Sequence, residues 1–311
     1  MFKSPSVRVS APAKINLHLG VGNLRPDGRH DLVTVFQALS LTDEVVVSVS
    51  ADPGVEIRGE GAGTVARGAA NRAWQAVLAL AEHCGRSTAD IDVRLALHKK
   101  IPVAGGMAGG NADAAATLVG LAELWKLDLT RAELATVAAR LGSDVPFHLF
   151  GGHALGTGRA DELMGVDIPH QFHWVVALDH GGLSTPLVFE ELELLRARAQ
   201  PPRVGHYPPL LDALSSGDPG QLALLLGNDL QAAALSIRPR LGRTLEAGLS
   251  AGALGGLISG SGPTCVFLCQ DHAHALRVGR RLSGYEGCRA VKVACGPVLG
   301  ARVVDRQGEF A

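Results

Sequence analysis

The stretch from Ile101 to Gly110, Ile-Pro-Val-Ala-Gly-Gly-Met-Ala-Gly-Gly, constrains the fold more than any other part of the sequence. Four of its residues are glycines within the six positions 105–110, which excludes a regular helix or strand. The apolar spacing of residues 111–125 behind it predicts a helix, with Asn111 as its N-cap. Because such a loop can turn backbone N–H groups toward an anion at a helix N-terminus, the pattern predicts a phosphate site. A tight strand-to-helix connection without a ligand is the alternative.

The loop is not of the Walker A type, because no Gly-Lys-Ser/Thr follows its glycines; the nearby basic residues Lys99 and Lys100 come before them. The net charge is −1 and the basic residues are scattered, which excludes the basic surface of a nucleic-acid binder. No apolar run approaches the ~18 residues that a membrane helix needs. The sequence thus predicts a soluble globular protein, in which a single small phosphate site remains possible.

The five cysteines form no CxxC pair and lie mostly in apolar segments, such as Cys265-Val-Phe-Leu-Cys269. An odd number of cysteines in such surroundings predicts buried thiols in a reducing compartment. The first ten residues lack the continuous apolar core of a signal peptide, so we expect a cytosolic protein.

Strand and helix patterns along the chain predict an α+β fold with two lobes. The lobes are expected to meet around residues 155–175, which gives domains 1–160 and 161–311, and residues 200–209 are the best linker candidate. Strands are expected at 7–10, 15–21, 45–49, 55–57, 91–97, 153–158, 174–178, 254–258, 264–269 and 289–294, and helices at 71–83, 111–125, 130–140, 186–196, near 221, 229–249 and 272–282.

Other segments carry polar or aromatic residues suited to chemistry. Lys14 and Asn16 are two apart in an apolar strand, so their side chains point the same way; a solvated edge is the alternative. Asp144 follows the 130–140 helix and is either an acid-base group or a turn residue. His30 could read a base edge or decorate a loop, and Phe189 would by default be core.

Several motifs occur together in the order of one enzyme family. They are Lys14-x-Asn16, the glycine-rich loop before a helix, Gly-Ser-Asp-Val-Pro at 142–146 and Ser-Gly-Ser-Gly at 259–262. On these motifs the chain resembles the GHMP kinases, from about Val7 to Val304. Its segments 12–17, 26–32, 34–37, 106–110 and 141–146 further resemble the members of that family that phosphorylate a cytidylyl methylerythritol.

The resemblance implies a two-domain GHMP kinase fold, with a ribosomal-S5-like N-terminal domain and a ferredoxin-like C-terminal domain. It also implies phosphorylation of the free C2 hydroxyl of that small-molecule substrate, in the non-mevalonate route to isoprenoids. ATP would be the phosphoryl donor, accompanied by magnesium. No nucleic-acid or membrane partner is implied.

The resemblance also implies roles for individual residues. Asp144 would be the catalytic base and Lys14 its partner near the transferred phosphoryl group. The substrate would contact Asn16, Arg29, His30, Thr185 and Phe189, with Pro186 beside them. ATP would contact Asn71 and Lys99 on the adenine side and, around its phosphates, Pro102, Val103, Ala104, Gly105, Gly106, Met107, Ala108, Gly109, Gly110 and Asn111.

Three positions depart from the family pattern. The family usually has Tyr where this chain has Arg29, Gly where it has Ala104 and Ser where it has Asn111. A guanidinium plane can also stack on a base, so Arg29 is expected to replace the ring. The amide of Asn111 replaces a hydroxyl that could meet magnesium, so no metal ligand is assigned. A homoserine or mevalonate type of GHMP kinase, or a non-catalytic nucleotide-binding protein, remains an alternative.

Overall fold

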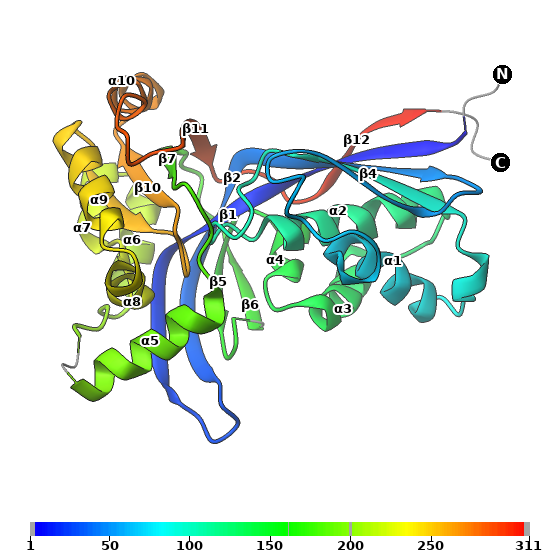
Figure 1. Ribbon diagram of the computed structural model, residues 1–311, viewed down its shortest axis with the longest axis horizontal. Coiled ribbons are helices and arrows are strands. Elements are labelled where there is room, and N and C mark those ends of the chain that lie inside the picture. The colour runs from blue at the N-terminus through cyan, green and yellow to red at the C-terminus, as the bar shows by residue number, and fades with distance from the viewer. Residues whose placement is uncertain (1–3, 161, 199–200, 308–311) are drawn as a thin grey trace.

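The chain folds into two lobes, each built on its own β-sheet (Figure 1). The computed structural model describes residues 4–160, 162–198 and 201–307. The strands are β1 (Ser6–Leu24), β2 (His30–Val49), β3 (Gly54–Gly59), β4 (Val93–Lys99), β5 (His153–Thr157), β6 (Glu162–Val166), β7 (Phe172–Leu178), β8 (Gly227–Asn228), β9 (Gly255–Ile258), β10 (Cys265–Cys269), β11 (Ala290–Gly296) and β12 (Arg302–Gln307). The α-helices are α1 (Arg72–His83), α2 (Gly109–Leu124), α3 (Arg131–Leu141), α4 (Val145–Phe150), α5 (Thr185–Arg198), α6 (Pro208–Ser216), α7 (Pro219–Leu225), α8 (Leu230–Ile237), α9 (Arg240–Ser250) and α10 (His272–Leu282).

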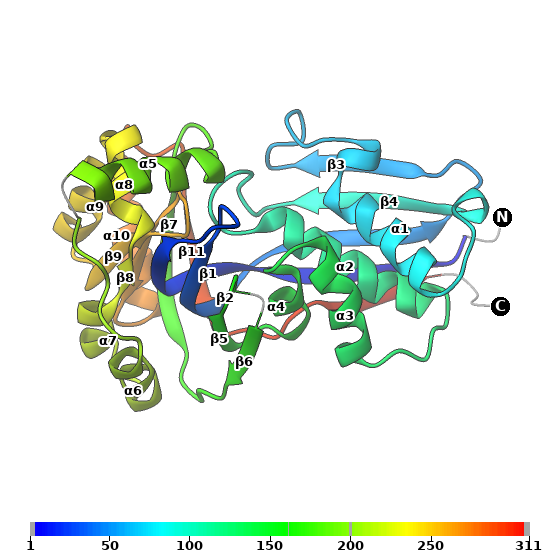
Figure 2. The same ribbon diagram turned by 90° about the horizontal axis from the view of Figure 1, so that it is seen from below.

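The larger lobe is a sheet in the order β12-β1-β2-β4-β3, with β5 and β6 joined to β2 and β8 joined to β1. Helices α1 to α4 lie against one face of it (Figures 1 and 2). The central helix α2 is lined with alanines and approaches the sheet closely. A Cβ at its Gly120 would lie 2.6 Å from Val47 Cγ2, so glycine is what permits that approach.

The smaller lobe is an antiparallel sheet in the order β11-β7-β10-β9. Counted along the chain this is the order 4-1-3-2 of a ferredoxin-like fold, so the expected architecture of the second lobe is confirmed. The fully buried side chains of Trp174 and Phe267 lie in this sheet. Helices α5 to α10 surround it at the left of Figure 1.

Two very long strands, β1 and β2, reach from the larger lobe to the smaller one. They are joined in a hairpin whose tip holds residues 25–29. Sequence patterning divided β1 into two strands because Ala-Pro-Ala interrupts its alternation. The structure keeps it continuous and absorbs Pro12 in a register shift between Pro12 and Ala13. The helix expected at 229–249 is divided into α8 and α9, because Pro239 stands between them.

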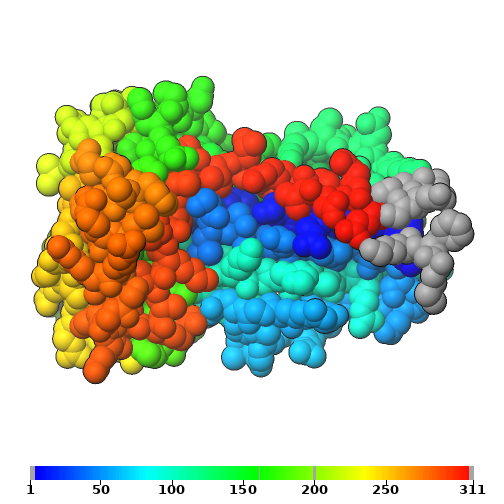
Figure 3. Space-filling model, turned by 90° about the horizontal axis from the view of Figure 1, so that it is seen from above, coloured from blue at the N-terminus to red at the C-terminus, as the bar shows by residue number. Residues whose placement is uncertain are grey.

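The chain passes from the first sheet to the second between β6 and β7, residues 166 to 172. The chain returns to the first sheet at its C-terminal end, where β12 pairs antiparallel with β1 (Figure 3). The domain division expected at residue 160 stays a prediction. Strand β12 comes after that division in the sequence but belongs to the sheet of the larger lobe. Within the described ranges, no helix is both long and apolar enough to cross a membrane.

Candidate active site

The glycine-rich loop lies between the two lobes and lines a cavity of about 620 Å³. It contacts the smaller lobe directly, because Leu183 donates a backbone N–H to the Ala104 carbonyl, 3.3 Å away, and Ser259 Oγ donates to the Gly106 carbonyl, 3.1 Å away. Gly106 has φ +76°, and a Cβ on it would lie 1.9 Å from the Ser259 carbonyl oxygen. Only glycine fits at this position.

The helix behind the loop begins two residues earlier than the sequence predicts. Its N-cap is Ala108, in the left-handed region at φ +57°, and α2 starts at Gly109. Asn111 is therefore inside the first turn and is not the cap. The expectation was wrong because glycines are poor helix residues in isolation, whereas here the helix interior is fixed by packing against the sheet.

Lys14 and Asp144 meet at the wall of this cavity. The Lys14 Nζ atom lies 3.7 Å from Asp144 Oδ2, and the lysine is 6% exposed. Burial lowers the pKa of Lys14, and the nearby Asp144 carboxylate opposes that shift. Asp144 stands at the N-cap position of α4 but makes no capping hydrogen bond, so its carboxylate is turned toward the cavity and Lys14. Lys14 is therefore not at a solvated edge, and the Asp144 side chain does not cap the helix.

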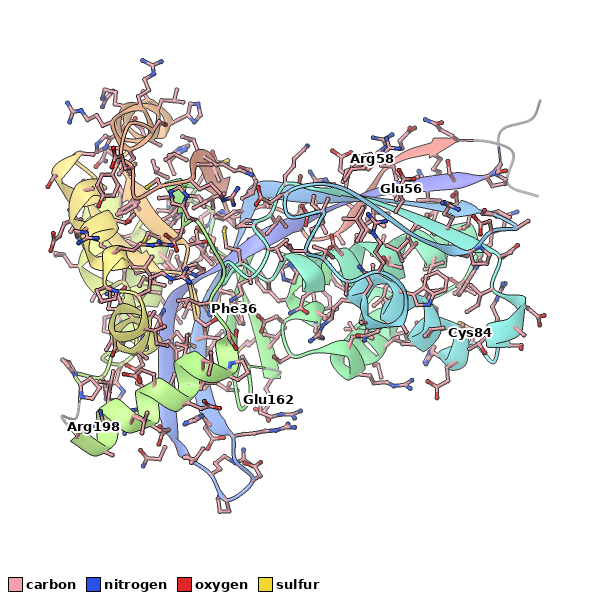
Figure 4. All side chains as sticks on the ribbon, viewed as in Figure 1. Phe36, Glu56, Arg58, Cys84, Glu162 and Arg198 are labelled. Atoms are coloured by element: carbon pink, nitrogen blue, oxygen red, sulfur yellow. The ribbon has the colours of Figure 1, made fainter. Side chains whose placement is uncertain are left out.

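A chain of buried hydrogen bonds orients the lysine. Its ammonium donates to Asn16 Oδ1 (2.7 Å), Asn16 Nδ2 donates to Thr34 Oγ1 (2.8 Å), and Thr34 donates to the backbone carbonyl of His18 (2.8 Å). The Lys14 Nζ atom also lies 5.3 Å from the ring centre of Phe36, which Figure 4 labels on β2. The ammonium is thus held in one place before any ligand binds.

A second cavity of about 1080 Å³ opens next to the first and is lined by Arg29, His30, Thr185 and Phe189. Thr185 and Phe189 line both cavities. The His30 and Phe189 rings are 5.2 Å apart, centre to centre, and His30 Nε2 is 3.0 Å from Glu193 Oε1. Since a carboxylate accepts, Nε2 is the donor in this contact.

Asn71 and Lys99 line the first cavity, but their polar groups have structural partners. Asn71 caps α1 by accepting from the backbone N–H of Ala73 and Trp74, and its amide donates to the Ala66 carbonyl. The Lys99 ammonium contacts the carboxylates of Asp43 and Asp113.

The structure therefore gathers the expected residues around two adjoining cavities. Met107 is the exception, because it is fully buried and lines neither of the two. Sequence reasoning missed Thr34, Asp43, Asp113 and Glu193. Each is an ordinary polar residue within a strand or helix pattern, and nothing local distinguishes it from a surface residue. A Cβ at Gly260, in the Ser-Gly-Ser-Gly turn at 259–262, would lie 3.3 Å from Asn16 Oδ1 and 3.5 Å from Lys14 Nζ, so this turn closes over the lysine.

Comparison with known proteins identifies the family. Models of the GHMP kinases N terminal domain and the GHMP kinases C terminal match residues 71–152 and 210–286. A 4-diphosphocytidyl-2-C-methyl-D-erythritol kinase of Saccharopolyspora erythraea is 61% identical over 96% of this chain and 94% of its own. One from Mycobacterium tuberculosis strain H37Rv is 54% identical over 98% of this chain and 95% of its own.

Solved structures agree. A crystal structure of 4-(cytidine 5'-diphospho)-2C-methyl-D-erythritol kinase superposes with a TM-score of 0.74 at 30% identity, covering 93% of this chain and 98% of that one. A homoserine kinase from Cytophaga hutchinsonii, at 22% identity and a TM-score of 0.74 over 96% of this chain and 97% of its own, shares the fold. Near-complete coverage at high identity confirms the expectation from the motifs: the chain belongs to the 4-diphosphocytidyl-2-C-methyl-D-erythritol kinases of the GHMP family.

Proposed function

We propose that this chain transfers the γ-phosphoryl group of ATP to the C2 hydroxyl of 4-diphosphocytidyl-2-C-methyl-D-erythritol, in the non-mevalonate route to isoprenoid precursors. The observation that carries the proposal is the pairing of Lys14 with Asp144 beneath the glycine-rich loop, next to a cavity lined by His30 and Phe189. A phosphate loop, an acid-base pair and a cavity that can take a nucleobase are the three parts that this reaction requires.

Asp144 accepts the proton of the C2 hydroxyl as that oxygen bonds to the γ-phosphorus and the bond to the β-phosphate oxygen breaks. Lys14, 3.7 Å away, supplies positive charge where negative charge spreads over the transferred group. Backbone N–H groups of the loop hold the remaining phosphates. Phosphoryl transfer depends mainly on positioning and electrostatics, which suits a site where Asn16 already fixes the lysine.

Magnesium is expected to arrive with ATP, because in such sites it keeps several waters and binds through one or two carboxylates and the phosphates. The chemistry of the wall fits this, since carboxylate oxygens line the cavity beside the loop where the phosphates would bind. When bound, the ion neutralises phosphate charge. Among the described residues, no group of three or more His, Cys, Asp or Glu side chains could hold a metal by itself.

His30 suits recognition of cytosine. In the neutral ring, Nε2 donates to Glu193 and Nδ1 would accept from the exocyclic amino group of cytosine, which is a donor. Phe189 and Arg29 line the same cavity from different elements, so a base between them would be stacked by a ring and a guanidinium plane.

An ADP-release assay over three alcohols tests the activity: the cytidylyl methylerythritol, homoserine and mevalonate. We expect turnover with the first alone. Turnover with homoserine or mevalonate instead would establish the other GHMP kinase type, and no release with any of the three would favour a nucleotide-binding protein without catalysis.

Asp144→Asn tests the base. We expect turnover to fall at least ~100-fold, the scale of a lost general base, while the Kd for ATP changes only a few-fold. Asp90→Asn, at an exposed position away from both cavities, is the matched control. Near-normal turnover of the Asp144 variant would remove this residue from the base role.

Arg29→Ala tests stacking on the cytosine. The KM for the cytidylyl substrate should rise more than the KM for ATP, because Arg29 lines only the second cavity of the two. Arg25→Ala on the same hairpin tip, where Arg25 pairs with Asp27 and Asp31, is the control. Equal changes in both KM values would contradict the stacking role.

We place the reaction in the cytoplasm. All five cysteines lie within the described residues and are free thiols, as a reducing compartment would keep them.

A further inference from the structure

Beneath the glycine-rich loop lies a buried cluster of three charged side chains, Asp43, Lys99 and Asp113, which come from β2, the end of β4 and α2. All three are at most 5% exposed. The Lys99 ammonium contacts the Asp43 carboxylate and lies 2.5 Å from Asp113 Oδ2. The cluster is therefore a shielded cation between two carboxylates.

The cluster is connected to both ends of the loop. At the start, Asp43 Oδ1 accepts the backbone N–H of Lys100 (2.5 Å) and of Ile101 (2.8 Å), the first residues after β4. At the far end, Lys99 donates to the Gly109 carbonyl, 3.3 Å away, and to Asp113, one turn into α2. One ammonium thus ties the strand before the loop to the helix after it.

Close packing at the far end adds a second constraint. A Cβ on Gly109 would lie 3.0 Å from Ile101 Cγ2 and 3.3 Å from Lys99 Nζ. The two ends of the loop are therefore in contact with each other and with the ammonium, which lies against the first turn of α2.

Stability alone does not account for the cluster. A buried ion pair rarely contributes more than well-packed apolar residues would, because removing the charges from water offsets their attraction. Burial raises the pKa of Asp113 to about 7, and its Oδ1 atom has no hydrogen-bond partner. The charge of the buried Asp113 carboxylate is thus only partly offset by its hydrogen bonds and ion pair. This indicates that the cluster has a role other than stabilisation.

We propose that Asp43, Lys99 and Asp113 are positioning residues that hold the glycine-rich loop in its phosphate-binding shape, and that the Lys99 ammonium acts on the loop and not on the adenine. The proposal rests on the proposed function, since it assumes that the loop binds the phosphates of ATP. It replaces the role expected for Lys99 from the resemblance, because the ammonium is already occupied by two carboxylates and a carbonyl.

Two variants test this by comparing ATP with adenosine, which lacks phosphates. Asp43→Asn weakens the loop start and Asp113→Asn the loop end, so one variant serves if the other does not fold. We expect the Kd for ATP to rise at least ~5-fold, equivalent to about 1 kcal/mol, and the Kd for adenosine to stay within about 2-fold. Binding is measured by competition against a fluorescent nucleotide.

Asp229→Asn is the matched control. Asp229 is also buried, accepts the backbone N–H of Val21 and Val204 and contacts Arg196, but it lies away from the loop. Its loss should lower the melting temperature and leave the ratio of the two Kd values unchanged.

Three results would overturn the proposal: an equal rise in Kd for ATP and adenosine, no rise for ATP, or the same change in ratio from Asp229→Asn. Wild-type protein that binds no ATP would overturn the proposal together with the proposed function. The ADP-release assay tests that function separately, so a failure of the loop proposal alone is distinguishable.

Discussion

Two buried histidines in the larger lobe should make the protein lose stability steeply in mild acid. His148 is fully buried on α4 and donates from Nδ1 to the Pro12 carbonyl, 2.8 Å away, while its Nε2 has no partner. His153 accepts at Nε2 from Gln37, whose amide oxygen accepts from Trp174. Protonation would leave a new buried N–H without an acceptor in the first case and would set it against an N–H donor in the second.

The magnitude follows from the pKa values. Burial lowers the pKa of both His148 and His153 to about 4, from an ordinary value of 6.5. A lowered histidine pKa contributes stability that is fully present above pH 6.5 and is lost as the pH falls from 6.5 toward 4. Between pH 7 and pH 5 each histidine therefore removes about 2 kcal/mol from the free energy of unfolding.

Urea unfolding at pH 5, 6 and 7, followed by tryptophan fluorescence, measures this loss for the wild type and for His148→Gln. The variant should be less stable at pH 7 but should lose about 2 kcal/mol less than the wild type on acidification. His83→Gln, at an exposed position in the last turn of α1, is the matched control and should follow the wild type. The same loss in His148→Gln and wild type would refute the reasoning.

Two further predictions concern the loop. Gly106→Ala should lower kcat/KM for ATP by ~100-fold, because its Cβ would force the loop away from Ser259. Gly165→Ala is the control, because no atom lies near its added Cβ. Normal kinetics of the Gly106 variant would contradict the close contact with Ser259. Ala104→Gly should raise the free energy of unfolding by about 0.5 kcal/mol, because φ +50° strains alanine, whereas Ala135→Gly within α3 should lower it by about 1 kcal/mol. A melting temperature that falls in both would count against strain at residue 104.

The loop and its helix were predictable because their information is local. Glycines spaced as at 105–110 leave few backbone solutions, and the apolar spacing behind them predicts a helix, although its first residue lies earlier than expected. The capping box of α3, with Thr130 and Glu133, is equally local, and that helix began and ended within one residue of its prediction. The strand β12 was missed because its partner, β1, lies at the other end of the chain. The short β6 pairs with the neighbouring β5, but its five residues are mostly exposed and leave no clear alternation in the sequence.

By itself, the sequence determined the family, the glycine-rich loop and the identity of the candidate acid-base pair, since these depend on residue types in a fixed order. Only the tertiary structure decided which partners each charge has. Lys14 and Lys99 look alike as lysines in apolar strands, yet the first is turned toward Asp144 and the second is neutralised by Asp43 and Asp113. Their partners are brought together from separate elements by packing, and at such short distances the surrounding burial and charge, not the residue type, set what each ammonium can do.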